Sequence, residues 1–142
     1  MASEIFKRIA AEKDRGEEWR VESAGTWALE GYPASEKARM VLKSRGMSAD
    51  DHISRGVTQE MLSSFDLILT MEEGHKEALR VEFPQLADRI YLLSEMVDQR
   101  HSVRDPINGT LADFEETADV LESLLRNGFD RIKRIAEDNA LK

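Results

Sequence analysis

The longest near-continuous apolar run in the chain is Phe65-Asp66-Leu67-Ile68-Leu69-Thr70-Met71. A short run of this kind is typical of a strand buried on both faces, as in a parallel sheet. A helical pattern follows directly over residues 73–83, so the sequence predicts a strand and then a helix. Because open α/β sheets bind ligands at the carboxyl ends of their strands, we expect residues 71–75 to lie beside any active site.

The rest of the chain alternates helical and strand patterns. Further helices are predicted over residues 2–14, from Pro33 to a cap at Gly46, and after an N-cap at Thr58. A one-turn helix capped by Ser94 and a long final helix from about 111 to about 137 follow, and Gly128 is expected to bend the final helix or to loosen its last third. Further strands are predicted over 19–22 and 89–93. This order predicts a three-layer α/β/α fold with a parallel sheet, in a single domain over residues 1–142.

Composition excludes several classes of protein. The 142 residues are 41% hydrophobic and 34% charged, which is typical of a folded chain in water. A net charge of −8 argues against a nucleic-acid partner. No apolar run approaches the roughly 20 residues of a membrane span, and the N-terminus lacks a signal-peptide pattern, so we expect no membrane contact and a cytoplasmic location.

The chain contains no cysteine and three histidines that are far apart in sequence. Disulfides, thiolate metal sites and a cysteine nucleophile are therefore excluded within these residues, and no metal or other cofactor is expected.

Five segments occur in the order and spacing of one known family. They are Met1–Phe6, Val21–Thr26, His52–Arg55 followed by Thr58, Asp66–Met71, and Asp105-Pro106. Together they resemble the low-molecular-weight protein tyrosine phosphatases and their bacterial relatives. The resemblance implies a phosphatase that hydrolyses phosphotyrosine, or phosphoarginine, on protein substrates through a phosphocysteine intermediate.

The family's first strand and its Cys-x5-Arg phosphate loop should precede the first helix, and neither is among these residues. We therefore expect an N-terminally truncated domain that does not turn over para-nitrophenyl phosphate. A non-catalytic pseudophosphatase that binds a partner is the alternative, and a relative of the arsenate reductases, which need further cysteines, is a weaker one. Without a central strand, the isolated chain is expected to be unfolded, molten or self-associated through exposed sheet edges.

The resemblance assigns roles to four residues. Asp105 would be the general acid, Ser23 would hydrogen-bond the phosphate loop, Trp27 would line the substrate pocket, and His52 would support the loop. Each also has an ordinary structural explanation, since aspartate before proline is common in turns and serine at strand ends.

Two departures from the family leave the substrate open. Ile107-Asn108 follows Asp105-Pro106 where many members carry aromatic residues that wall the pocket, so the tyrosine preference is in question. His75 and Lys76 follow the buried strand, and we expect them to be solvated.

Overall fold

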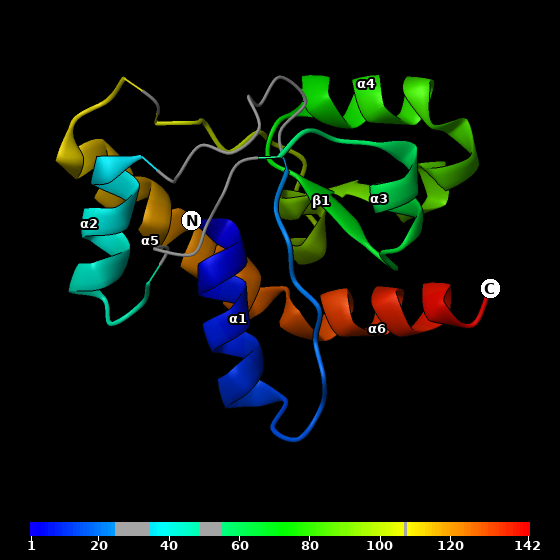
Figure 1. Cartoon of the computed structure of the whole chain (residues 1–142), viewed down its shortest axis with the longest axis horizontal. Coiled ribbons are helices and arrows are strands. Elements are labelled where there is room, and N and C mark those ends of the chain that lie inside the picture. Colours follow the sequence, from blue (N-terminus) through cyan, green and yellow to red (C-terminus); the bar gives the residue numbers. More distant parts are fainter. Residues whose placement is uncertain (25–34, 49–54, 107) are drawn as a thin grey trace. The chain divides into compact units, whose positions relative to one another are not determined.

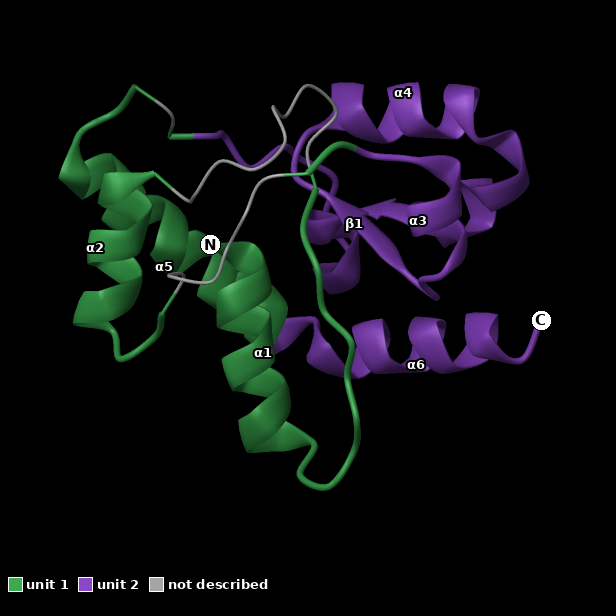
Figure 2. Ribbon diagram, viewed as in Figure 1, with its two compact units in different colours: residues 1–56, 106–126 green, residues 57–105, 127–142 purple. Residues whose placement is uncertain are grey.

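The computed structural model describes residues 1–24, 35–48, 55–106 and 108–142 (Figure 1). They divide into two compact units (Figure 2), unit 1 with residues 1–56 and 106–126 and unit 2 with residues 57–105 and 127–142. Within the described ranges, no helix is long and apolar enough to cross a membrane. The expectation of a single domain over 1–142 stays a prediction.

Unit 2 is built on a β-α-β segment. Strand β1 (Ile68–Thr70) leads into helix α4 (Glu73–Glu82), and strand β2 (Ile90–Leu92) pairs with β1 in parallel, with Ile68 opposite Ile90. The predicted strand, helix and parallel pairing are therefore confirmed, although both strands are shorter than predicted. Parallel strands need a crossover between them, and α4 supplies it.

An apolar cluster joins these elements. Its buried members are Leu62, Leu79, Phe83, Leu86 and Ile90, and Val57 and Ile68 pack against them. Leu62 belongs to helix α3 (Gln59–Ser63) and Leu86 to the 3-10 helix η1 (Pro84–Arg89). Unit 2 also contains the 3-10 helix η2 (Leu93–Val97) and helix α6 (Phe129–Ala140). As predicted, Thr58 caps α3, since its hydroxyl accepts a hydrogen bond from the Met61 N–H at 3.1 Å.

Unit 1 holds helices α1 (Ala2–Lys13), α2 (Glu36–Ser44) and α5 (Leu111–Asn127). The Ser35 hydroxyl caps α2 by accepting from the Ala38 N–H. Gly46 ends it as predicted, with a φ of 78°. The Gly46 N–H donates to Lys43 O, and the next N–H, of Met47, donates to Leu42 O at 2.8 Å. This pair of bonds is the Schellman arrangement that glycine favours.

Three local predictions differ from the structure. Residues 19–22 form no strand, because Trp19 is held by side-chain contacts with α1 and the segment has no ladder within the described residues. Ser94 is no helix cap, because it lies inside η2 and bonds the backbone of His101 instead. The single final helix predicted over about 111–137 is two helices, α5 and α6, which Gly128 separates, because glycine has a low helix propensity.

Candidate active site

The loop that leads to Asp105 is fixed to the carboxyl end of β1. Val103 is buried, and its N–H donates to the carbonyl of Met71, the residue after β1, at 2.7 Å. One residue earlier, the Ser102 hydroxyl accepts from the Glu73 N–H at 3.1 Å, in the first turn of α4. Asp105 is exposed and follows two residues after this anchor. Its loop therefore runs along the strand end where open α/β sheets bind ligands.

The start of the same loop is held equally closely. The buried Ser94 hydroxyl donates to His101 O at 2.7 Å and accepts from the His101 N–H at 3.0 Å. Asp98 takes the left-handed conformation, with a φ of 60°, where η2 ends. Arg131 of α6 donates to the carbonyl of Glu95 at 2.8 Å and to the Asp98 carboxylate at 2.6 Å. These bonds fix both the beginning and the middle of the loop within unit 2.

A tight turn follows Asp105 in unit 1. The Gly109 N–H donates to Pro106 O at 2.6 Å, and Asn108 has a φ of 67°. Thr110 then caps α5: its hydroxyl accepts from the Asp113 N–H at 3.2 Å, and the Asp113 carboxylate accepts from the Thr110 N–H at 2.9 Å. This reciprocal pair is a capping box, which fixes where α5 begins. These bonds hold the segment after Asp105 to the start of α5 within unit 1.

Only glycine fits at position 109. A Cβ there would lie 2.7 Å from Pro106 O and 2.8 Å from the Asp113 carboxylate. The Gly109 carbonyl accepts a hydrogen bond of 2.6 Å from the Lys37 ammonium of α2. Both backbone polar groups of Gly109 are therefore hydrogen-bonded, the N–H to Pro106 O and the carbonyl to Lys37.

Charged side chains are paired around the carboxyl end of β1 in unit 2. Lys76 forms a short ion pair with Glu95 and is only 12% exposed, so the prediction that it is solvated was wrong. Burial raises the pKa of Glu95, but the hydrogen bonds from Lys76 and from the Leu92 N–H outweigh it and leave that pKa below its usual value. His75 is half exposed and lies 3.8 Å from Glu72. Neither Lys76 nor Glu95 is therefore a free acid or base.

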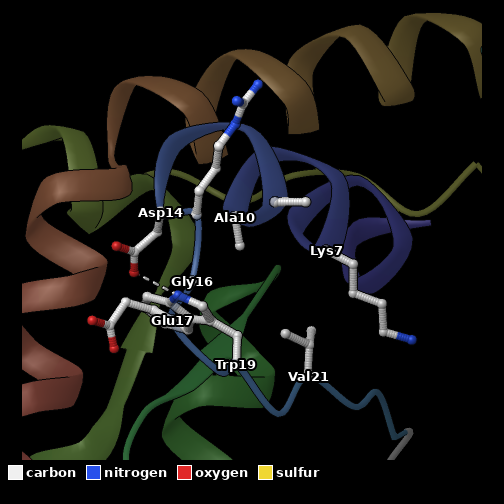
Figure 3. A pocket seen from close by; sticks show the side chains of 9 residues that line it. Lys7, Ala10, Asp14, Gly16, Glu17, Trp19 and Val21 are labelled. Carbon is white, nitrogen blue, oxygen red and sulfur yellow. Dashed lines mark hydrogen bonds between the residues drawn. The ribbon is translucent and has the colours of Figure 1, made fainter.

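A separate hollow of about 510 Å³ lies on unit 1, beside the second half of α1 (Figure 3). Trp19 forms one wall, where it packs edge-on against Phe6 and donates to the Asp14 carboxylate at 2.7 Å. Lys7 and Glu17 also line it. This lining offers no serine, histidine or cysteine that could act as a nucleophile. In the described part of the chain, no group of three His, Asp or Glu residues could hold a metal ion.

Comparison with known proteins decides what this scaffold is. The profile of the family described as low molecular weight phosphotyrosine protein phosphatase matches residues 1–139. The chain belongs to this family. It is therefore a member of a family of protein phosphatases, and the resemblance drawn from five short segments is confirmed.

Individual phosphatases agree with this assignment. A protein-arginine-phosphatase of Bacillus subtilis is 33% identical over 135 residues, which are 94% of this chain and 88% of that protein. The low molecular weight phosphotyrosine protein phosphatase of Homo sapiens is 30% identical over 120 residues, 81% of this chain and 75% of that protein.

Solved structures show the same likeness. The low molecular weight protein tyrosine phosphatase of T. tengcongensis has a TM-score of 0.85 at 34% identity, over 92% of this chain and 88% of that one. A mutant of YwlE from Bacillus subtilis has a TM-score of 0.85 at 32% identity, over 93% of this chain and 88% of that one. These neighbours and the parallel sheet confirm the predicted α/β/α fold class.

The phosphatase residues predicted from sequence have different outcomes. Asp105 lies in unit 2 on the anchored loop and the half-buried Ser23 belongs to unit 1. The roles of both residues stay predictions. Trp27 and His52 lie outside the described residues. Lys37 and the Thr110 capping box were not predicted from the sequence, although the Thr110-x-x-Asp113 pattern before an apolar helix is a known signal.

Proposed function

We propose that the protein removes phosphate from phosphotyrosine or phosphoarginine on proteins, with Asp105 as the general acid. The 142 residues contain no cysteine, so the phosphocysteine route needs a thiolate from outside them. The observation that carries the proposal is Asp105-Pro106 on a loop anchored at the carboxyl end of β1, in a chain of this family.

Two proton transfers by Asp105 complete the chemistry. The thiolate attacks phosphorus, the bond from phosphorus to the leaving oxygen or guanidino nitrogen breaks, and the Asp105 carboxyl gives that atom its proton. The Asp105 carboxylate then takes a proton from water. The water oxygen attacks phosphorus, the sulfur–phosphorus bond breaks, and phosphate and thiolate are released.

The test uses the protein encoded by the full reading frame that contains residues 1–142, called the full-frame protein below. We expect it to hydrolyse para-nitrophenyl phosphate and to form a phosphocysteine detectable by mass spectrometry. We expect residues 1–142 alone to show no turnover, because an aspartate by itself supplies only about 10²–10⁴-fold. Turnover by residues 1–142 of confirmed mass, abolished by Asp105→Ala, would contradict the phosphocysteine route.

A specific observation favours testing phosphoarginine alongside phosphotyrosine. The residues after Asp105-Pro106 are Ile107-Asn108, without the aromatic walls that suit a tyrosine ring, and the Bacillus subtilis relative is named a protein-arginine-phosphatase. Matched peptides that carry either phosphoresidue, compared by kcat/KM in the full-frame protein, decide between the two. A preference below about tenfold would assign the protein to neither class alone.

Partners and location follow from the same proposal. The substrates are phosphoproteins in the cytoplasm, and the net charge of −8 argues against nucleic acid. Within the described residues β1 pairs only with β2, and we expect residues 1–142 alone to be unfolded, molten or self-associated through exposed sheet edges. Light scattering that shows a folded monomer would contradict this expectation. The relatives bear the names of enzymes, so a non-catalytic remnant is not favoured.

A further inference from the structure

Lys37 makes an unusual contact for an exposed lysine. It lies in the first turn of α2, and its ammonium donates to the carbonyl of Gly109, 72 residues later, at 2.6 Å. Exposed lysines are strongly hydrated and flexible, and they rarely hold one geometry without a reason. A charge-assisted bond to a backbone carbonyl fixes a piece of main chain, which an ion pair with another side chain does not.

The bonded carbonyl belongs to the turn that follows Asp105. The N–H of the same residue, Gly109, donates to Pro106 O, and Pro106 shares its peptide bond with Asp105. There is no free space beside Gly109, since a Cβ would meet Pro106 O at 2.7 Å. A shift of the Gly109 peptide would therefore displace Pro106, which is covalently bonded to Asp105.

Helix α2, which carries Lys37, is itself fixed within unit 1 by buried side chains and hydrogen bonds. Val41 and Leu42 are buried in unit 1. At the other end of the helix, Arg45 donates to Asp119 at 2.7 Å and to the carbonyl of Glu115 at 3.2 Å, both on α5. The helix is thus tied to α5 at its C-terminal end by Arg45 and to the turn before α5 at its N-terminal end by Lys37. Only the second tie touches the Asp105 turn.

We propose that Lys37 is a positioning residue for Asp105: it holds the Gly109 carbonyl and so fixes where the general acid presents its proton. This inference rests on the proposed function. Proton donation matters most for leaving groups whose conjugate acids are weak, since a good leaving group departs with little help. Loss of the Lys37 bond should therefore slow phenyl phosphate far more than para-nitrophenyl phosphate.

The kinetic test compares three variants of the full-frame protein on these two substrates. Lys37→Met keeps the length of the stem and removes the donor, and we expect kcat on phenyl phosphate to fall about tenfold with KM little changed, because small misplacements of a catalytic group are costly. On para-nitrophenyl phosphate the fall should be about twofold. Lys37→Arg restores a donor and should recover most of the loss. Arg45→Met is the matched control, which should leave the ratio of the two rates unchanged.

Amide hydrogen exchange gives a readout that does not depend on activity. In Lys37→Met, the Gly109 and Thr110 amides should exchange about tenfold faster, the factor expected for losing one charge-assisted hydrogen bond, while Arg45→Met should leave them unchanged. Unchanged exchange in Lys37→Met, or equal losses on both substrates, overturns the positioning role. If exchange changes as expected but the full-frame protein has no phosphatase activity at all, the proposed function fails and the structural tie stands.

Discussion

Replacing Gly109 by alanine tests the turn after Asp105 directly. The added Cβ would lie 2.7 Å from Pro106 O and 2.8 Å from the Asp113 carboxylate, far inside the carbon contact distance of about 3.5 Å. Pro106 O cannot retreat without weakening its 2.6 Å bond from the Gly109 N–H, and Asp113 cannot retreat without opening the capping box. Overpacking costs about 1–3 kcal/mol and a lost cap about 1 kcal/mol, so we expect a loss of about 2–4 kcal/mol.

Calorimetry of the full-frame protein measures this loss. For a chain of this size, about 3 °C of Tm accompanies each kcal/mol, so Gly109→Ala should lower Tm by about 6–12 °C. Gly74→Ala is the matched control, because Gly74 lies in α4 with nothing within 4 Å of its Cβ position. There alanine should raise stability by about 0.5–1 kcal/mol, since it improves helix propensity. If Gly109→Ala shifts Tm by less than about 2 °C, or raises it as the control does, the crowded turn is not as described.

Two further predictions concern unit 2. The pKa of Glu95 is lowered by the bonds from Lys76 and the Leu92 N–H against the opposing effect of burial, so its stabilisation is complete above the usual glutamate pKa of about 4.3 and is lost as pH falls below it. Glu95→Gln should therefore flatten the fall of Tm between pH 6 and pH 3, and an unaltered slope would refute this. Ser94→Ala should cost about 1–3 kcal/mol in urea unfolding, because it leaves both backbone groups of His101 without their partner; Ser94→Cys, which keeps a weak donor, should cost less.

Features that depend on neighbouring residues could be predicted from the sequence. The buried strand, the cap at Thr58 and the end of α2 at Gly46 follow from apolar spacing and local hydrogen-bond chemistry. The low helix propensity of Gly128 marked a weak point in the final helix, although not that the helix divides in two there. Each of these features is determined by residues a few positions apart, so it can be predicted without knowledge of the tertiary structure.

Features that depend on residues distant in the sequence could not be predicted from it. Residues 19–22 have the alternation of a strand, but a strand exists only with a ladder partner, and Trp19 instead packs against Phe6 and Asp14. Ser94 has the chemistry of a helix cap, yet its hydroxyl is used by His101. Local pattern cannot tell which of two chemically suitable partners a side chain will find.

The candidate site likewise combines a feature that the sequence indicated with one that it did not. Asp105-Pro106 is an ordinary turn pattern on its own, and only the order of five family segments marked Asp105 as functional. The bond from Lys37 to Gly109 joins residues 72 positions apart. No spacing rule predicts it, because the two residues are brought together by the tertiary fold.

The most direct test of Asp105 as the proton donor is the rate of phenyl phosphate hydrolysis by the full-frame protein with Asp105→Asn. Asparagine keeps the size of the side chain and removes the transferable proton, so kcat should fall about 10²–10⁴-fold while the phosphocysteine still forms from an activated substrate. A variant that retains kcat within about threefold of the unaltered protein on phenyl phosphate would contradict the central claim.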